Sequence, residues 1–400
     1  MKIVKVVLVG IGGYGMTFVR EILKNSDELI HLVGVVDPYP ERCEWIDRIK
    51  MCKVPIYPNM EEFYRNHSAD LAVISTPIFL HTKHILQALE HGSNVLCEKP
   101  LCSDESDLDR LYRAQKKAGK FIYIGYQWSY SQAITELKRD ILCNKFGALI
   151  EMKTLILRPR RRDYFERGAG WAGKISMDDG TIVYDSVANN SAAHFLFNML
   201  YVMGDQGKAA TASDITAELL RANNIENFDI AKIQFKLLNG ARASFIAAHP
   251  VEMENAIEPI FEYIFEKGTI YYSSQPLDAS YQLFPREYEE FGQIVAIMKD
   301  GSKKIYGDPD SDSCRKLHMA VRAVAEGRSD DGVCGLAAAA EHTKLINYVQ
   351  KNSRIYVVKS NLVREKEQLI YVKDLFIKAL SSYRDVDHSL LQLAEDFAKS

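Results

Sequence analysis

The stretch VVLVGIGGYG, residues 6–15, decides how the first part of the chain is expected to fold. An apolar run of strand length leads into glycines at positions 10, 12 and 15, and a helix-type pattern starts at Met16. The spacing G-x-G-x-x-G is weak evidence on its own, but it gains weight when a strand precedes it and a helix follows it. The stretch therefore predicts the first strand, turn and helix of a dinucleotide-binding fold.

Each glycine of this turn has a separate physical task. The bare backbone of Gly10 permits the tight turn, Gly12 lets a pyrophosphate approach the helix N-terminus, and Gly15 lets helix and strand pack closely. Gly13 and Tyr14 complete the loop. We expect all five residues to lie beside the cofactor.

Asp37 stands 22 positions after Gly15, at the end of the second predicted strand. A carboxylate there can accept hydrogen bonds from both ribose hydroxyls and would repel a 2′-phosphate, which favours NAD over NADP. Arg42 is the nearby residue that could compensate for a 2′-phosphate. The alternative is that Asp37 is only a turn residue of the segment DPYP, 37–40.

The pattern of elements predicts two domains and an extension. Up to Tyr126, strand-length apolar runs such as LAVIST (71–76) and NVLCEK (94–99) alternate with helix-period segments, which is typical of a doubly wound parallel Rossmann sheet. Longer strand-like runs and the turn signal Lys267–Gly268 follow, which indicate an α+β domain with a mostly antiparallel sheet. We therefore predict a Rossmann domain at 1–126, an α+β domain at 127–353, and a strand and helix extension at 354–400.

Composition excludes several classes of function. A formal net charge of -3 over 400 residues gives no reason to expect nucleic acid or an anionic membrane surface as a partner. No segment reaches the roughly 18 consecutive apolar residues of a membrane span. Seven scattered cysteines show no zinc-type spacing, so no metal site is expected and a reducing cytoplasm fits best.

Polar residues follow two of the predicted parallel strands, where ligands of such sheets bind. Thr76 and Pro77 follow one strand and are expected beside the nicotinamide, and Glu98 and Lys99 follow another. A lysine beside a carboxylate and a cofactor can exchange a proton with a substrate hydroxyl while hydride moves. The alternative is a solvated Glu–Lys pair at a strand end.

These motifs together resemble the Gfo/Idh/MocA family of oxidoreductases. The resemblance rests on GIGGYG (10–15), Asp37, STP (75–77), His81 and above all CEKP (97–100). It implies an NAD(P)-dependent dehydrogenase of sugars, cyclitols or polyols, with Lys99 catalytic and His81 at a helix start beside the cofactor. It also implies an open-faced second sheet through which the chain forms a homodimer or homotetramer.

The segment YDSVANNSAAH, 184–194, departs from the family pattern of an aspartate four residues before a histidine. His194 lies ten residues before Gly204, which resembles the family's spacing, so Asn190 stands where the aspartate is expected. Asp185 and Asn190 are separated by about 500° of rotation on one helix, so Asp185 could serve only from before the helix start or as its cap. An asparagine cannot take a proton, so we expect Lys99 and His194 to relay protons and Asn190 to orient a hydroxyl. A buried structural histidine is the alternative for His194.

The run ILRPRRRDYFERGAGWAGK, 156–174, is basic and aromatic. Such a loop can stack on sugar rings and pair with acidic groups, or it can be a solvated or subunit-interface loop. The candidate substrate residues are Arg160, Tyr164, Trp171, Lys174 and Asp185, with Tyr126 and Trp128 after the last Rossmann strand.

The leading hypothesis is a cytoplasmic, NAD-dependent oxidoreductase acting on a secondary alcohol or ketone of a sugar or polyol. One alternative is a glycosidase-type enzyme that oxidises a sugar transiently and keeps NAD bound. The other is an NAD-sensing regulator without catalysis, to which the replacement of the family's aspartate by Asn190 lends mild support.

Overall fold

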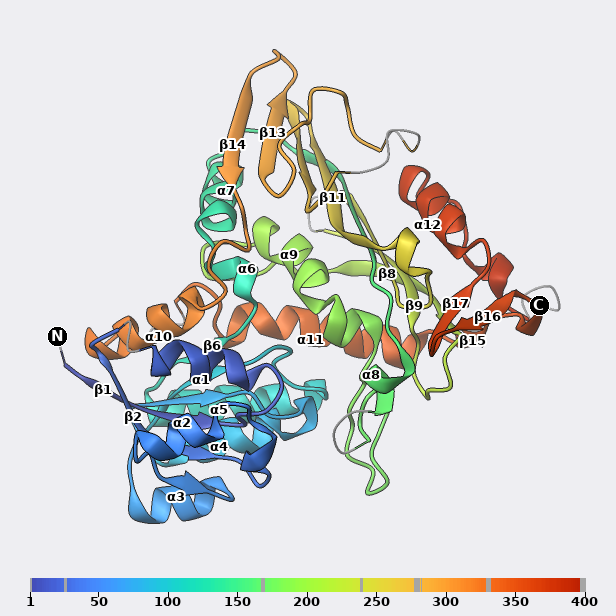
Figure 1. The fold of residues 1–400 in the computed structure, drawn as a ribbon. Helices are drawn as coiled ribbons and strands as arrows, with labels where there is room; N and C mark the ends of the chain where they lie inside the picture. The colour runs from blue at the N-terminus through green and yellow to red at the C-terminus, as the bar shows by residue number, and fades with distance from the viewer. Residues whose placement is uncertain are drawn as a thin grey trace. The chain divides into compact units, whose positions relative to one another are not determined.

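The structure is a computed structural model that describes residues 2–24, 27–166, 170–237, 240–276, 281, 283–328 and 332–395. It consists of two compact units (Figure 1). The first comprises Met1–Ser131, Gln206–Lys208 and Asp310–Thr343, and the second comprises Gln132–Asp205, Ala209–Pro309 and Lys344–Ser400. The sequence prediction places 310–343 within 127–353, yet this segment groups with the first unit because helix α10 (Arg315–Ala325) packs on strands of the first sheet.

The first unit contains a six-stranded parallel sheet, as the sequence predicts. Its strand order is β3-β2-β1-β4-β5-β6, so the order reverses between β1 and β4, where such folds bind their ligands. The strands are β1 Val4–Val9, β2 Ile30–Val36, β3 Ile56–Tyr57, β4 Leu71–Ile74, β5 Asn94–Cys97 and β6 Ile122–Ile124. The helices are α1 Gly15–Leu23, α2 Ile46–Met51, α3 Met60–Asn66, α4 His81–Glu90, α5 Leu108–Ala118 and α6 Gln127–Tyr130.

Burial explains why the first unit folds this way. Every residue of β4 and β5 is buried, as expected for parallel strands with helices on both faces of the sheet. Because β1, β4 and β5 are parallel neighbours, their carboxyl ends lie at one edge of the sheet, next to the glycine turn.

The second unit contains a nine-stranded sheet in the order β14-β13-β12-β11-β7-β10-β9-β8-β15. It is mostly antiparallel, as predicted, with parallel pairing between β7 and β10 and between β8 and β15. The strands are β7 Leu149–Leu157, β8 Ser213–Arg221, β9 Ile230–Lys236, β10 Arg242–Ala248, β11 Ile257–Phe265, β12 Gly268–Ser273, β13 Ile294–Met298, β14 Lys303–Gly307 and β15 Ile355–Val357. The helices are α7 Gln132–Leu142, α8 Arg162–Glu166 and α9 Ala193–Met203, while α11 (Leu336–Asn352) contributes residues to both units.

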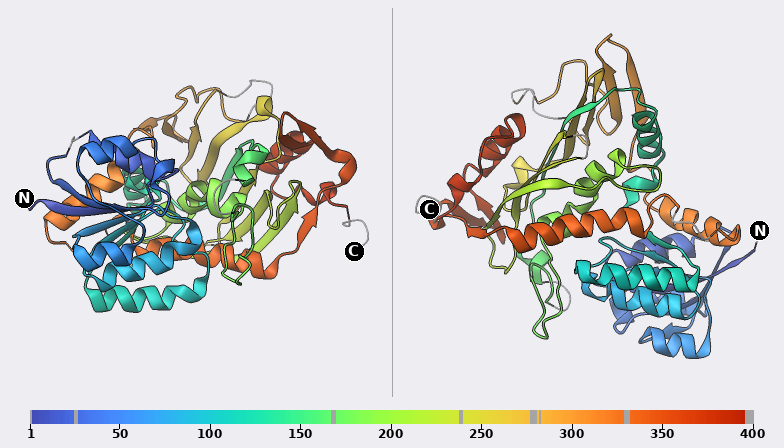
Figure 2. Two further views of the ribbon diagram at one scale, coloured as in Figure 1. Left: turned by 60° about the horizontal axis from the view of Figure 1, so that its bottom comes forward. Right: turned by 180° about the vertical axis from the view of Figure 1, so that it is seen from behind.

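The C-terminal extension is part of the core of the second unit. It adds β15 beside β8, forms a hairpin from β16 (Val363–Lys366) and β17 (Leu369–Val372), and ends in helix α12 (Leu375–Arg384). Figure 2 shows α12 and α9 on opposite faces of the second sheet, and both helices contact β7. Leu375, Ala379 and Leu380 are buried there with Leu155 and Ile246 of the sheet. The extension therefore covers one face of the sheet along β7 and β10. The last five residues of the predicted 354–400 segment lie outside the described ranges.

Candidate active site

The glycine turn has the shape that the sequence predicts. Gly10 has a φ of 82°, and a Cβ atom there would lie 2.8 Å from the carbonyl oxygen of Ser75. A Cβ at Gly15 would overlap the carbonyl oxygen of Gly10, so these two positions are closed to larger residues. At Gly12 a Cβ would meet nothing within 4 Å. The backbone at Gly12 thus borders open space, which fits a pyrophosphate at the N-terminus of α1.

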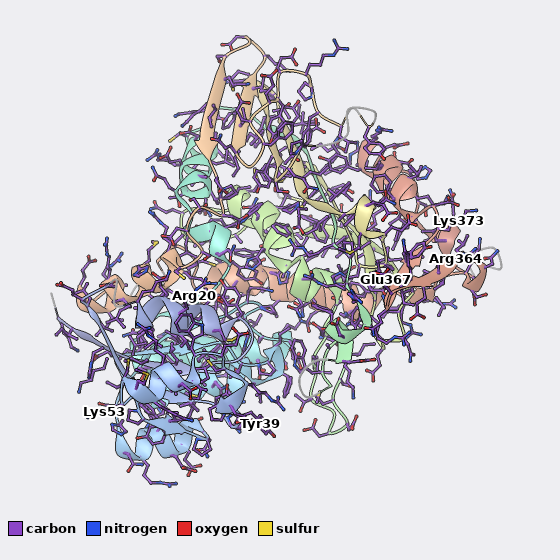
Figure 3. The ribbon with its side chains drawn as sticks, in the orientation of Figure 1. Arg20, Tyr39, Lys53, Arg364, Glu367 and Lys373 are labelled. Atoms are coloured by element: carbon purple, nitrogen blue, oxygen red, sulfur yellow. The ribbon has the colours of Figure 1, made fainter. Side chains whose placement is uncertain are left out.

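Asp37 ties the end of β2 to this turn. Its Oδ2 accepts a hydrogen bond from the backbone N–H of Ile11 at 2.9 Å, and its Oδ1 accepts one from Tyr39 at 2.9 Å. Each carboxylate oxygen keeps a second lone pair, so the bonds leave acceptor capacity for a ribose hydroxyl. Arg42 lies 4.4 Å over the ring of Tyr39, which is labelled on the surface of this unit in Figure 3. The geometry fits Asp37 as both a turn residue and a ribose acceptor.

His81 joins the loops that follow β4 and β5. Its Nδ1 lies 2.7 Å from the carbonyl oxygen of Pro100 and its Nε2 lies 2.9 Å from that of Thr76. Burial lowers the pKa of His81, although both carbonyls favour its charged form. The hydroxyl of Thr76 lies 3.0 Å from Nδ1 of His84, and burial lowers the pKa of His84 to about 4. His81 therefore links the segment of Thr76 and Pro77 to the loop that follows β5.

The carboxylate of Glu98 has a partner that the sequence analysis missed. Lys316 of α10 places its Nζ 2.5 Å from Oε1 of Glu98, and the backbone N–H of Lys99 donates to Oε2 at 3.3 Å. Glu98 therefore forms an ion pair with Lys316. A sequence signal existed, because Lys316 falls on the same helical stripe as the buried residues Ala320 and Ala323.

The segment before α9 is not one continuous helix. Ser186 caps a π-helical turn, Val187–Ser191, and accepts a hydrogen bond from the N–H of Asn189 at 3.2 Å. Ala192 has φ -107° and ψ 9°, and α9 begins after it. Asn190 and His194 are therefore on successive helical segments, although their four-residue spacing predicts one helix. Both are half-buried.

The structure separates the two neighbouring asparagines. Asn189 is buried, and its side-chain amide donates to the carbonyl oxygen of Tyr184 at 3.0 Å. Asn190 instead donates through Nδ2 to Oδ1 of Asp185 at 2.8 Å. Asp185 precedes the capped turn, so the rotation argument for a single helix does not apply to this pair. Ser186, and not Asp185, caps the turn.

Part of the basic loop lies against this turn. Nη2 of Arg160 is 3.4 Å from Oγ of Ser191, and its guanidinium lies 4.8 Å over the ring of Tyr164. The backbone N–H of Gly173 donates to Oδ2 of Asp185 at 2.6 Å. The structure thus brings Arg160 and Tyr164 close to Asn190.

The remaining candidates have other surroundings. Lys174 pairs with Asp178 at 3.2 Å, and Trp171 is half-buried. Tyr126 is fully buried and Trp128 is 2% exposed, with the indole N–H of Trp128 donating to Asp310 at 2.9 Å. These two aromatics contribute to the interior of the first unit.

Within the described ranges, no group of three or more His, Cys, Asp or Glu side chains could hold a metal ion. In the same part of the chain, no helix is both long enough and apolar enough to span a bilayer.

Comparisons with known proteins bear on the family and the fold. Residues 4–126 match the family model described as an oxidoreductase family with an NAD-binding Rossmann fold. The chain is 27% identical over 150 residues to a 2,7-anhydro-N-acetylneuraminate hydratase of Mediterraneibacter gnavus, which covers 38% of each protein. It is 32% identical over 145 residues to inositol 2-dehydrogenase 4 of Saccharopolyspora erythraea, covering 36% of this chain and 42% of that protein. The matches thus span about two fifths of these relatives.

A solved structure extends the likeness in fold to most of the chain. The WlbA dehydrogenase of Bordetella pertussis, in complex with NADH and UDP-GlcNAcA, superposes with a TM-score of 0.68 at 18% identity. The superposition covers 88% of this chain and 96% of that one. Both units therefore share their fold with a dehydrogenase of known structure.

Proposed function

Because residues 4–126 belong to the Gfo/Idh/MocA family of NAD-binding oxidoreductases, we propose that the protein is an NAD-dependent dehydrogenase of a sugar, cyclitol or polyol derivative. It would transfer hydride between a secondary alcohol or ketone carbon and the nicotinamide. The observation that carries the proposal is the position of Lys99, two residues after the end of β5, at the edge of the sheet next to the glycine turn.

The residues of the glycine turn, Asp37, Thr76 and Pro77 would hold the dinucleotide. When bound, it supplies the hydride acceptor or donor. Lys99 would take the proton of the substrate hydroxyl as the carbon loses hydride, and would return it in the reverse direction. His194 would complete the proton relay, and Asn190 would orient a substrate hydroxyl without exchanging a proton.

The second unit would supply substrate contacts as well as proton chemistry. Arg160 and Tyr164 lie beside the turn that carries Asn190, and the guanidinium fork of Arg160 suits a carboxylate or phosphate group on a sugar. Trp171, Lys174 and Asp185 remain candidates on the neighbouring loop. We further propose a homodimer or homotetramer formed through the second sheet outside the part that α12 covers, and a cytoplasmic location.

The test is a substrate screen with purified protein, NAD and a panel of sugars, cyclitols and polyols. The readout is the absorbance of the reduced nicotinamide. Lys99→Ala is expected to lower turnover by about 10²- to 10⁴-fold while NAD affinity changes less than about threefold. Lys83→Ala, an exposed lysine of α4, is the matched control. Equal turnover of Lys99→Ala and wild type would refute the role of Lys99.

A second candidate is a reaction without net oxidation, such as elimination from a transiently oxidised sugar. It is favoured by the similarity to a hydratase of an anhydro sugar acid. Release of product without accumulation of reduced nicotinamide would select this alternative. If the protein binds NAD and turns over none of the panel, the NAD-sensing regulator becomes the better description.

A further inference from the structure

Lys316 is a fully buried cation in the first unit. Its side chain has 0% exposure, and its Nζ lies 2.5 Å from Glu98 Oε1 and 3.3 Å from the carbonyl oxygen of Gly125. The same ammonium lies 4.5 Å from the ring centre of Tyr14, in the glycine turn. One side chain of α10 thus contacts both the cofactor turn and the residue before Lys99.

Packing alone does not explain a lysine at this position. Its helix also buries Leu317, Ala320 and Val321, so burial of this stretch by itself favours apolar side chains. Removing an ammonium from water is costly unless a close charge and further hydrogen bonds offset the loss of hydration. Burial alone would lower the pKa of Lys316, but the neighbouring Glu98 and Tyr14 raise it, so the ion pair stays charged.

Tyr14 is held from a second direction. Its hydroxyl donates to Oε1 of Gln127 at 3.3 Å, and Nε2 of Gln127 donates to Oδ1 of Asp310 at 2.8 Å. Asp310 precedes α10 in the chain. The segment 310–316 therefore fixes Tyr14 through Asp310 and Lys316, and the same segment fixes Glu98.

The pairing of Glu98 also changes the charge next to Lys99. A carboxylate beside an ammonium favours the charged lysine and raises its pKa, whereas a second cation nearby lowers it. With Lys316 in place, the negative charge of Glu98 is shared with a cation other than Lys99. The titratable groups around the pair include Tyr14 and Cys314 on the side of Lys316, and Cys97, His81 and Lys99 on the side of Glu98.

We propose that Lys316 is a positioning residue that fixes the Glu98 carboxylate and the Tyr14 ring, and that its charge makes the Lys99 amine easier to deprotonate. Any effect of Lys316 on catalysis rests on the proposed role of Lys99. The effect of Lys316 on the Lys99 amine is independent of that role, because it can be measured without any substrate.

The test is competitive labelling of the full-length protein with acetic anhydride, which reacts with the neutral amine. The labelled Lys99 peptide is quantified by mass spectrometry over a pH series. In Lys316→Met, labelling of Lys99 at about pH 8 is expected to slow by about tenfold, which corresponds to a pKa rise of about one unit. Lys316→Arg keeps the charge and should label like wild type, and the double variant Glu98→Gln/Lys316→Met, without either charge, should return to within about threefold of wild type.

Lys316→Gln is the second variant, for use if Lys316→Met does not fold. The amide of glutamine can still donate a hydrogen bond to Glu98 but carries no charge. It should show the same slow labelling. Unchanged labelling of Lys99 in a folded Lys316→Gln or Lys316→Met protein overturns the proposal. If the substrate screen finds no substrate, the proposed dehydrogenase function fails, but the labelling result still stands. If the protein turns over a substrate and the labelling of Lys99 is unchanged in the Lys316 variants, only the positioning role of Lys316 is refuted.

Discussion

The side-chain amide of Asn190 donates a hydrogen bond to Oδ1 of Asp185 at 2.8 Å. An ionised carboxylate only accepts hydrogen bonds, so the nitrogen of the amide must face Asp185 and the oxygen must face away from it. Asp185 is fixed in turn by the backbone N–H of Gly173. The side-chain oxygen of Asn190 therefore points away from Asp185, which suits its proposed role as an acceptor for a substrate hydroxyl.

Asn190→Asp would place two carboxylates in contact. One of them is expected to hold a proton in the folded state, with a pKa above its unfolded value of about 3.9. A raised folded pKa gives stability that is present below pH 4 and is lost as pH rises through the folded pKa. Thermal melts should thus show a deficit against wild type that grows between about pH 5 and pH 8.

The exchange variant Asp185→Asn/Asn190→Asp tests this account. It again pairs one amide with one carboxylate, now with the amide at 185 and the carboxylate at 190. The pH-dependent loss of thermal stability should therefore disappear. A deficit that persists in the exchange variant, or one that is independent of pH in Asn190→Asp, would contradict charge repulsion as the cause.

Asp37→Asn tests the preference for NAD. The amide oxygen can still accept a backbone hydrogen bond at the end of β2, but the negative charge that would repel a 2′-phosphate is lost. The ratio of NADP to NAD affinity, measured by titration calorimetry, should rise by about tenfold. Glu41→Gln, a charge change on the same loop, is the control, and an unchanged ratio in Asp37→Asn would show that Asp37 does not set the preference.

The local parts of the fold could be predicted from the sequence because their causes are local. Glycine sterics in residues 10–15 and the alternation of strands and helices fixed the parallel sheet before any long-range contact was known. The mostly antiparallel second sheet could also be predicted, from the lengths of the strands and from the turns. The grouping of 310–343 with the first unit could not be predicted, because a helix pattern does not show which sheet the helix covers.

The finer geometry of the site depends on features without a local signature. The π-helical turn at Val187–Ser191 interrupts the single helix that a four-residue spacing predicts. Ser186 caps this turn, and Asp185 accepts a hydrogen bond from Asn190. The partner of Glu98 is 218 positions away in the chain. The local signal for this pair is the position of Lys316 on the apolar stripe of α10, which indicates a buried charge.

Asp140 provides a pH-dependent contribution to the stability of the second unit. Burial opposes ionisation there, but hydrogen bonds from Lys145, Lys304 and Tyr306 outweigh it and lower the pKa of Asp140 to about 2. A lowered folded pKa gives stability that is present above pH 4 and is lost as pH falls towards 2. Because both lysines are partly exposed, we expect Asp140→Asn to cost about 1–2 kcal/mol at neutral pH and little near pH 2. Denaturant midpoints at both pH values measure this, with the exposed Asp178→Asn as control.

Leu375→Ala tests whether the C-terminal extension is integral to the second unit. Leu375 is 0% exposed at the start of α12, among sheet residues such as Leu155 and Ile246. Loss of a buried leucine side chain should lower the free energy of unfolding by about 2–5 kcal/mol, because transfer energy is lost and a cavity remains. Ile377→Ala on the same helix is the matched control, since Ile377 is 56% exposed and should cost less than about 1 kcal/mol. Equal denaturant midpoints for the two variants would mean that α12 contributes little to the core, and that the face along β7 and β10 can open to a partner.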